Sequence, residues 1–379
     1  MFAALMCGES AVSQIFPDLA KPVAAAPVDF DESKWFTRLQ LAGVDRVSQL
    51  AVAAADMALA DAAAAGSADP ERIGVYVGCG MGGAAALETA YRAGGRVPPL
   101  TIPAFMPNAP AAHVAMRLGV QGPVITYSVA CASSAVAIAE AAKAVRSGEV
   151  DLAIAGGTEA LIVPGVVLAW QAMQTLASFR PGEAASSCRP FSIDRSGFVL
   201  GEGAAFMILE SAEHARQRGV RSYAQLAGWG ISCDATHLTK PDMQGQQRAL
   251  RAALKVADLE PADVGYCNAH GTATRIGDVV ECSALAGLWG EQIDRLHVSS
   301  TKAMHGHLLG AAGALEAVIT VLALHHAQLP PNANCTETDP ECPVNLVLQP
   351  GTEATDLKAA ISSSFAFGGT NAALLFKRI

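Results

Sequence analysis

The chain has 379 residues, 51% of them hydrophobic and 16% charged, with a formal net charge of −9, which predicts a large, well-buried globular body and argues against general nucleic-acid binding. Nine cysteines without a CxxC pair or metal-ligand spacing predict reduced thiols in the cytoplasm and no metal or other cofactor. No basic leader opens the chain and no uninterrupted apolar run reaches the roughly 20 residues of a bilayer span, so we expect no membrane insertion.

Helix and strand patterns alternate along the chain. In the first part, apolar periodicity predicts helices at 48–65, 111–118 and 132–146 and strands at 73–77, 124–129, 152–155 and 203–209. In the second part it predicts helices at 247–257, 278–288 and 311–326 and strands at 265–268, 298–301, 359–363 and 372–376. The two series have a similar order, so we expect an α/β protein with two duplicated halves, residues 1–210 and 211–379, packed as one compact unit.

Cys131 lies between the predicted strand 124–129 and the alanine-rich helix that follows it. A thiol at a helix N-terminus faces unpaired N–H groups and the positive end of the helix dipole, which favour the nucleophilic thiolate. A buried cysteine acting as a small apolar filler is the alternative. Taken by itself, this segment leaves the two interpretations open.

Four further segments follow predicted strands. The glycine run 78–83 satisfies GxGxxG, but it lacks an acidic residue about 20 residues on, so a close-packed turn is favoured over a dinucleotide site. His270 follows one strand, and Lys302 precedes His307 by five residues after another. The Phe-Gly-Gly turn at 367–369 can present backbone N–H groups to an oxyanion. Alone, each of these segments is equally compatible with ordinary packing. One thiol, two imidazoles and one ammonium together suit acyl transfer followed by carbanion chemistry.

Six ordered blocks, beginning with the segment around Cys131 and ending with 367–371, resemble the β-ketoacyl-acyl-carrier-protein synthases of the elongating kind, over about residues 30 to 379. The resemblance implies a thiolase-like fold, with two pseudo-repeated mixed-sheet halves in stacked α-β-α-β-α layers. It also implies decarboxylative condensation of an acyl-cysteine with malonyl-acyl carrier protein, in fatty-acid, polyketide or polyene biosynthesis. An acyl carrier protein and a homodimer, or a heterodimer with a chain-length factor, are the implied partners.

The same resemblance assigns roles to individual residues. Cys131 would carry the acyl group, His270 and His307 would support decarboxylation, and the N–H groups of Cys131 and Phe367 would hold the oxyanion. Lys302 would organise the site through Glu316. Phe367 would also gate the acyl pocket. Four further residues would contact pantetheine or substrate: Thr272, Thr274, Gly368 and Met106. Asp278 and Asn371 would support the site. Met106 would line the acyl pocket at the dimer interface.

Three departures from the family pattern lead to further expectations. The opening strand, which we place at the centre of the first sheet, is absent, so either the recorded start lies downstream of the true one or another segment fills the gap. The segment 37–46 has only Arg38 and Arg46 where relatives have a basic cluster, which predicts weaker carrier docking or a different docking surface. Ala366 replaces a glycine beside Phe367, which predicts a less mobile gate and faster turnover of long acyl chains in Ala366→Gly.

Two other functions compete with the condensing enzyme. A non-catalytic chain-length partner of a heterodimer usually lacks the nucleophile, whereas Cys131 and both histidines are present here. A Cys-His hydrolase would give Lys302 and the Phe-Gly-Gly turn no role. A thiolase is disfavoured because no cysteine follows Cys342.

Overall fold

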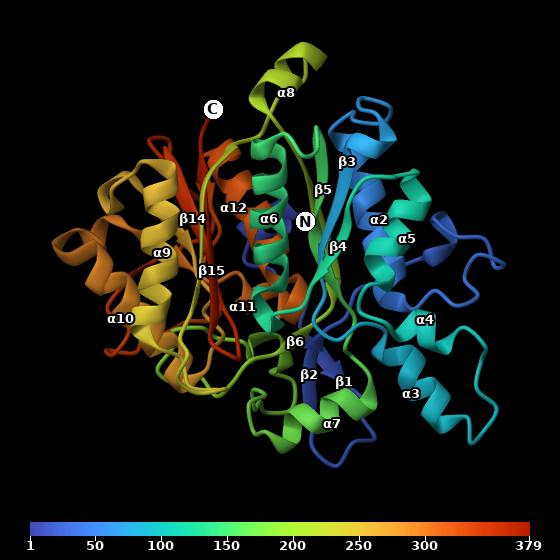
Figure 1. The fold of residues 1–379 in the computed structure, drawn as a ribbon. Helices are drawn as coiled ribbons and strands as arrows, with labels where there is room; N and C mark the ends of the chain where they lie inside the picture. Colours follow the sequence, from blue (N-terminus) through green and yellow to red (C-terminus); the bar gives the residue numbers. More distant parts are fainter.

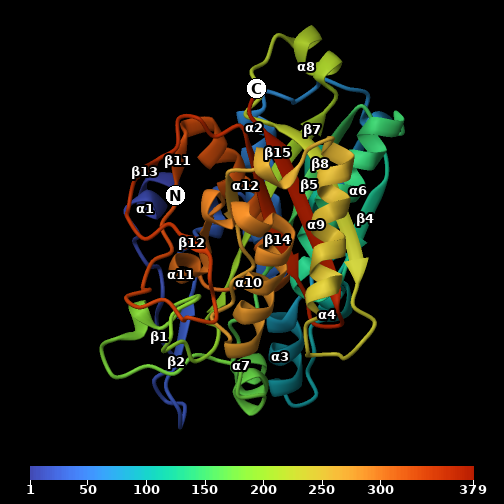
Figure 2. The ribbon, with the colours of Figure 1, turned by 90° about the vertical axis from the view of Figure 1, so that its left-hand side faces the viewer.

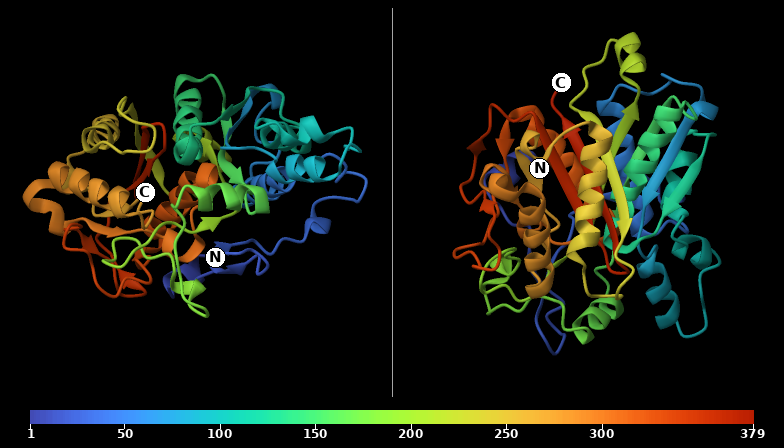
Figure 3. Two further views of the ribbon diagram at one scale, coloured as in Figure 1. Left: turned by 90° about the horizontal axis from the view of Figure 1, so that it is seen from below. Right: turned by 60° about the vertical axis from the view of Figure 1, so that its left-hand side comes forward.

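Two mixed β-sheets stand side by side with helices on both of their faces, giving five layers in the order α-β-α-β-α (Figures 1 and 3). The computed structural model describes residues 1–379. The first sheet has the strand order β4 (Val124–Tyr127), β3 (Ile73–Gly78), β5 (Leu152–Glu159) and β7 (Gly203–Glu210). The second has the order β12 (Asn345–Leu346), β10 (His297–Ser299), β9 (Tyr266–Asn268), β14 (Ala359–Phe365), β15 (Thr370–Lys377) and β8 (Gln225–Cys233). The layered α/β architecture predicted from the sequence is confirmed.

Six helices make up the three helical layers. The middle layer holds α6 (Ser133–Ser147) and α12 (Ala312–His326), whose alanine-rich faces let them pack between the two sheets. The outer face of the first sheet is covered by α2 (Arg46–Asp61) and α5 (Ala109–Leu118). The outer face of the second is covered by α9 (Met243–Ala257) and α10 (Arg275–Trp289), which stand in front in Figure 2.

The smaller elements lie around these layers. They are α1 (Phe2–Met6), β1 (Ser13–Ile15), β2 (Val23–Ala26), α3 (Ala84–Arg92), α4 (Thr101–Phe105), α7 (Pro164–Ala172), β6 (Leu200–Gly201), α8 (Ala212–Arg218), α11 (Lys302–His305), β11 (Gln328–Leu329) and β13 (Thr352–Glu353). Short 3-10 turns occupy Glu32–Lys34, Pro70–Arg72, Ala130–Ala132, Ala184–Ser186, Pro261–Asp263, Gly290–Arg295 and Leu309–Ala311. Strands β1, β2 and β6 form a separate three-stranded sheet, which lies in the lower part of the view in Figure 1.

One segment, Leu309–His326, is apolar and long enough to cross a bilayer by length and composition. In the structure 72% of it is buried, because α12 lies between the two sheets and contributes to the largest apolar cluster. Its hydropathy is therefore that of a helix with protein on both sides.

From the sequence we expected a gap at the centre of the first sheet. The structure shows no such gap, so that expectation was wrong. Strands β4, β3, β5 and β7 are paired without interruption. In the second sheet β15 pairs on one side with β14 and on the other with β8, whereas β7 pairs only with β5. The position that β8 occupies beside β15 therefore has no counterpart beside β7, which is an edge strand.

Candidate active site

Cys131 is positioned by a sharp turn between β4 and α6. Ala130 adopts a left-handed conformation (φ 49°), Cys131 lies in the following 3-10 turn, and α6 begins at Ser133. A non-glycine residue in this region is strained, and such strain persists where the surrounding packing holds it. The Ser133 hydroxyl fastens the turn by accepting from Val129 N and donating to Ala130 O. The turn places the sulfur at the N-terminal end of the central helix.

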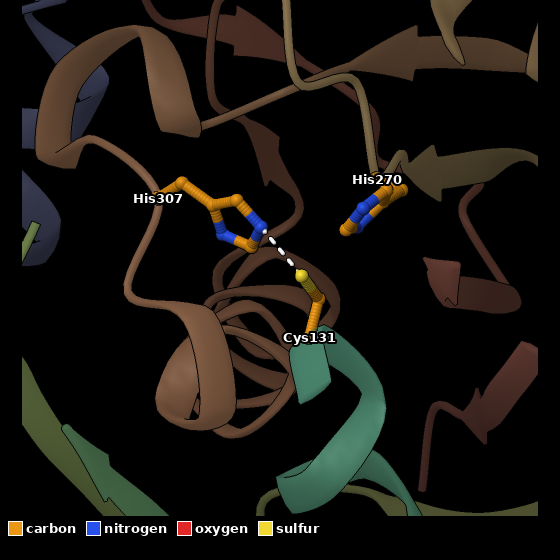
Figure 4. A group of neighbouring side chains, drawn as sticks. All are labelled: Cys131, His270 and His307. Carbon is orange, nitrogen blue, oxygen red and sulfur yellow. Dashed lines mark hydrogen bonds between the residues drawn. The ribbon is translucent and has the colours of Figure 1, made fainter. Parts of the chain in front are cut away.

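His307 faces this sulfur from the other half of the molecule (Figure 4). Its Nε2 lies 3.0 Å from Cys131 Sγ. The backbone N–H of Leu309 donates to Nδ1 at 3.2 Å, so a neutral ring carries its proton on Nε2. That Nε2–H is therefore directed at the cysteine sulfur, where it can stabilise negative charge.

His270 completes the group. Its ring centroid is 5.3 Å from that of His307 at an interplanar angle of 83°, and its Nδ1 has no hydrogen-bond partner. One ligand-type atom each from Cys131, His270 and His307 lies within 4.8 Å of the others. The convergence of the thiol and both imidazoles predicted from the sequence is observed. A thiol and two imidazoles are also ligands that a soft metal ion accepts. The buried ammonium of Lys302 nearby disfavours a second cation at this position.

Lys302 is buried and fixed by two interactions. Its Nζ donates to the carbonyl oxygen of His270 at 2.6 Å and forms an ion pair with Glu316. Neither side chain is exposed. A buried charge requires such a partner, so the ammonium ties the His270 loop to α12 and leaves a fixed positive charge beside the imidazoles.

Burial and this charge set the protonation states. Burial first, and then Lys302, lowers the pKa of both His270 and His307 well below the ordinary value, so both rings are neutral. Burial raises the pKa of Cys131 to about 12, opposed by Lys302 and by a hydrogen bond from the Phe367 backbone N–H. The helix-terminus argument alone favoured the thiolate, but desolvation outweighs it in the resting protein.

A cavity of about 500 Å³ leads to these three side chains. It is lined by Thr272, Thr274 and Phe367, as the resemblance implied. The two threonine hydroxyls lie 3.0 Å apart, and Thr274 also caps α10 by accepting from Gly277 N. The Phe367 ring is 37% exposed and lies 6.3 Å from that of Trp170.

Of the other predicted site residues, only Asn371 lines the cavity. Gly368 and Met106 do not line it, and Met106 is 42% exposed on the surface. Asp278 accepts from Phe191 N at 2.8 Å and lies 3.6 Å from Arg195, so it holds the loop around residue 191. Asn371 lines the cavity, and its Nδ2 donates to Asp234 at 2.6 Å and to Gly369 O at 3.2 Å. It thereby fixes the Phe-Gly-Gly turn.

The glycine run 78–83 is a close-packed turn, as predicted. A Cβ on Gly78 would meet the backbone nitrogen of Ser134 at 2.1 Å. The buried carboxylate of Glu159 accepts from Gly80 N at 2.8 Å and from Gly310 N at 3.0 Å. Glu159 therefore joins this turn to the start of α12.

The structure bears on two expectations drawn from departures in the sequence. Ala366 does not lie in the left-handed region, where Gly368 (φ 88°) and Gly369 (φ 78°) do, so alanine at 366 carries no backbone strain. Relief of strain in this conformation therefore gives no support to Ala366→Gly, and the effect of that change on gate movement stays a prediction. Arg46 is not free for docking, because it donates to Glu202 at 2.7 Å and to Val28 O at 2.6 Å, which leaves Arg38 alone in that segment.

Glu281 is the clearest residue that sequence reasoning missed. Its carboxylate accepts from His270 N at 2.8 Å, Gly271 N at 2.7 Å and the Ser363 hydroxyl at 2.8 Å. It is buried and fixes the loop that carries His270. Its place three residues after Asp278, on the same helix face, was an available signal.

Comparison with known proteins is decisive for the family. The model described as "Beta-ketoacyl synthase, N-terminal domain" matches residues 19–215, and "Beta-ketoacyl synthase, C-terminal domain" matches 223–336. The chain belongs to the β-ketoacyl synthase family. Nodulation protein E of Rhizobium meliloti is 42% identical over 347 residues, covering 90% of this chain and 84% of the relative. The 3-oxoacyl-[acyl-carrier-protein] synthase 2 of Staphylococcus aureus is 39% identical over 343 residues, covering 88% and 82%.

Solved structures extend the agreement to the whole synthase fold. A β-ketoacyl synthase from Burkholderia phymatum superposes with a TM-score of 0.91 at 34% identity, covering 100% of this chain and 94% of that one. The ishigamide ketosynthase/chain length factor gives 0.91 at 33% identity with the same coverage. The thiolase-like fold predicted from the sequence is confirmed, and the protein is a condensing transferase of the ketosynthase type.

Proposed function

We propose that this synthase condenses an acyl group held on Cys131 with malonyl-acyl carrier protein, giving 3-oxoacyl-acyl carrier protein, CO2 and free carrier protein. The observation that carries this proposal is the 3.0 Å approach of His307 Nε2 to Cys131 Sγ, with His270 alongside, in the wall of a cavity of about 500 Å³. Acyl transfer needs the thiol, and decarboxylation needs donors at the developing oxyanion.

In the first half-reaction the Cys131 sulfur attacks the acyl thioester of the carrier. The S–C bond to Cys131 forms, the bond to the carrier sulfur breaks, and the thiol proton leaves with the carrier. The His307 Nε2–H and the Phe367 N–H both point at the sulfur, so they lower the cost of negative charge in this dry site. The N–H groups of Cys131 and Phe367 hold the thioester oxygen during the transfer.

In the second half-reaction malonyl thioester loses CO2, and negative charge moves to its thioester oxygen. Two neutral imidazoles face that position, and their depressed pKa values keep them neutral as hydrogen-bond donors. The enolate carbon attacks the acyl carbonyl, the bond to Cys131 breaks, and the released thiolate takes up one proton from the solvent, which restores the resting thiol. Lys302 and Glu316 position His270 through its carbonyl oxygen.

The proposal extends to partners and substrates. Thr272 and Thr274 contact the pantetheine arm of the carrier, and Phe367 with Gly368 gates the acyl pocket. Strand β4 pairs only with β3 and leaves Val124 40% and Ile125 39% exposed, which supports a dimer, of identical chains or with a chain-length factor, through this edge. Met106 lines the acyl pocket across that interface. The enzyme works in the cytoplasm without a bound cofactor.

Intact-mass spectrometry after incubation with acyl-acyl carrier protein tests the proposal. We expect one acyl adduct on Cys131, its loss with CO2 release when malonyl carrier protein is added, and no adduct in Cys131→Ser. Cys233→Ser, which changes an exposed cysteine, is the matched control and should behave as the wild type. No adduct in the wild type would indicate the non-catalytic chain-length partner instead. Rapid loss of the adduct without condensation would indicate a hydrolase.

A further inference from the structure

His305 lies inside the segment that carries Lys302 and His307, but it has no part in the chemistry described above. It ends α11, the single helical turn that Lys302 begins, and it precedes His307 by two residues. We propose that His305 is a positioning residue: it holds the peptide bond that precedes His307 and thereby keeps the His307 ring directed at Cys131. As a statement about turnover, this inference rests on the proposed function.

The hydrogen bonds of His305 determine which of its ring nitrogens carries the proton. Its Nδ1 lies 2.8 Å from the carbonyl oxygen of Gly306, which can only accept, so Nδ1 is protonated and donates. Burial first, and then Lys302, lowers the pKa of His305 to about 3, so the ring carries no charge at neutral pH. A neutral ring leaves Nε2 as an acceptor, and the Thr301 hydroxyl donates to it at 3.0 Å. The other contact of that hydroxyl, with Asn268 Oδ1, is longer at 3.4 Å.

The peptide bond between Gly306 and His307 is held at both of its polar groups. Its carbonyl oxygen accepts from His305 Nδ1, and its N–H donates to the carbonyl oxygen of Val199 at 2.6 Å. A peptide unit is planar, so hydrogen bonds at its two ends fix the orientation of a plane that includes the Cα of His307. The direction in which the His307 side chain leaves the backbone depends on that plane.

Gly306 is the residue about which this peptide bond would turn if it were not held. It adopts φ 68° and ψ −172°, a conformation that glycine reaches without a steric penalty. Gly306 is buried, so without His305 its carbonyl oxygen would lose its donor in a place where unpaired polar groups are costly. Loss of the His305 ring therefore favours rotation of this peptide bond away from its present orientation.

The remaining contacts of His307 act on the other side of its Cα. Its backbone oxygen accepts from Gly201 N at 3.0 Å, and its Nδ1 accepts from Leu309 N at 3.2 Å. Only His305 and Val199 hold the peptide bond before that Cα. The 3.0 Å approach of Nε2 to the cysteine sulfur requires the chain to be held on both sides.

Two variants separate the two hydrogen bonds of the His305 ring. The carboxamide nitrogen of asparagine can replace Nδ1, so His305→Asn keeps the donor to the Gly306 carbonyl oxygen. The carboxamide oxygen of glutamine can replace Nε2, so His305→Gln keeps only the acceptor for Thr301. His305→Leu removes both. We expect His305→Asn to react with rates within about twofold of the wild type, and the other two variants to be slower by about tenfold.

Two rates at Cys131 measure the positioning: alkylation by iodoacetamide, located by peptide mapping, and acylation by acyl-acyl carrier protein, followed by intact mass. Alkylation at about pH 8 reports the hydrogen bond from His307 in the resting protein, because loss of that donor reduces the thiolate fraction. CO2 release from a preformed acyl-enzyme should fall by less than acylation, since His270 is held by other contacts. A purely structural role would change thermal unfolding and leave these ratios unaltered.

His326→Leu is the matched control, because His326 is exposed at the far end of α12, and it should retain both rates. The inference is overturned if His305→Leu matches the wild type, or if His305→Asn is no faster than His305→Gln. The second comparison decides the matter even where His305→Leu fails to fold. Failure of the wild type to form an acyl adduct would reject the proposed function, while the alkylation rates would still decide the position of His307.

Discussion

The two halves of the molecule share a scaffold but not a chemical role. Strands β4, β3, β5 and β7 match β10, β9, β14 and β15 in order and direction, three parallel strands followed by one antiparallel. In each half the first of these strands leads to a central helix, α6 or α12. The nucleophile lies on the turn before α6, whereas Lys302 begins α11 and His307 lies on the turn between α11 and α12.

A second difference lies in the segments that follow β3 and β9, the sheet neighbours of β4 and β10. β3 is followed by the glycine turn 78–83, which packs against the backbone of α6, while β9 is followed by His270, which lines the cavity. The duplicated scaffold thus brings its two central helix N-termini together, and each half supplies what the other lacks. The comparison teaches that the site depends on the contact between the halves rather than on either half alone.

The largest expected effect comes from removing the imidazoles of the second half. His307→Ala should slow acylation of Cys131 by about 10²- to 10³-fold, because the donor to the sulfur is lost. His270→Ala should spare acylation and slow CO2 release from malonyl carrier protein, since its ring does not bond the sulfur. Single-turnover acylation and CO2 release measure the two steps separately. Equal effects of both substitutions on both steps would contradict the division of roles.

The buried ion pair of the second half gives the next largest effect. Lys302→Met leaves Glu316 buried without its partner and should lower the free energy of unfolding by about 3–5 kcal/mol. Burial raises the pKa of Glu316 to about 7 although Lys302 lowers it, so removing Lys302 raises this pKa further. Protonation of Glu316 then relieves the unpaired charge, and the loss of stability should shrink as the pH falls towards 7. The double variant Lys302→Met/Glu316→Leu should recover most stability in denaturant titrations but not activity. A loss independent of pH would argue against this explanation.

The pH dependence of the nucleophile sharpens the view of the first half. Because burial raises the pKa of Cys131 to about 12, its alkylation by iodoacetamide should rise about tenfold per pH unit from pH 7 to 10. A free thiol levels off above about pH 8.5. The Cys131 thiol is an acid whose pKa is higher in the folded than in the unfolded protein. It therefore lowers the free energy of unfolding as the pH rises above the thiol pKa of the unfolded chain. A plateau below pH 8 would show that the helix terminus outweighs burial.

The smallest expected effect concerns the edge strand that only the second half possesses. Gly230→Ala places a Cβ 1.9 Å from the carbonyl oxygen of Ala249 on α9, and should cost about 1–3 kcal/mol as the helix shifts. Ile231→Val, on the exposed side of the same strand, is the control and should change stability by less than about 0.5 kcal/mol. Thermal unfolding monitored by circular dichroism measures both. Equal stability of Gly230→Ala and the wild type would mean that α9 and β8 are packed more loosely than described.

Much of the fold was predictable because its elements are long and periodic. The strands at β3, β5, β7, β14 and β15 and the helices α2, α6, α9, α10 and α12 were all predicted, with bounds shifted by a few residues. Strand β8 was missed because Gly228 and Gly230 resemble a loop. Glycine is required at these two positions because β8 packs closely against α9, and a Cβ at either position would meet a backbone carbonyl of that helix. The short strands β1, β2 and β6 were missed because strands of two to four residues are too short to show an alternation of apolar and polar side chains.

The chemistry of the site followed the same division. Residue types and their positions after predicted strands were sufficient to select Cys131, His270, Lys302 and His307. The sequence could not determine which imidazole bonds the sulfur, because that depends on the Leu309 N–H that holds the His307 tautomer. Nor could it reveal Glu281 as the anchor of the His270 loop, or Arg46 as engaged by Glu202.

By itself, then, the sequence determined the layered α/β scaffold, the family and the four groups of the site, because local periodicity and short motifs are written along the chain. Only the tertiary structure decided the protonation of those groups, the uninterrupted pairing of the first sheet and the partners that hold Arg46 and Glu281. Desolvation, pairing and exposure depend on residues brought together from distant parts of the chain, and no local pattern specifies them.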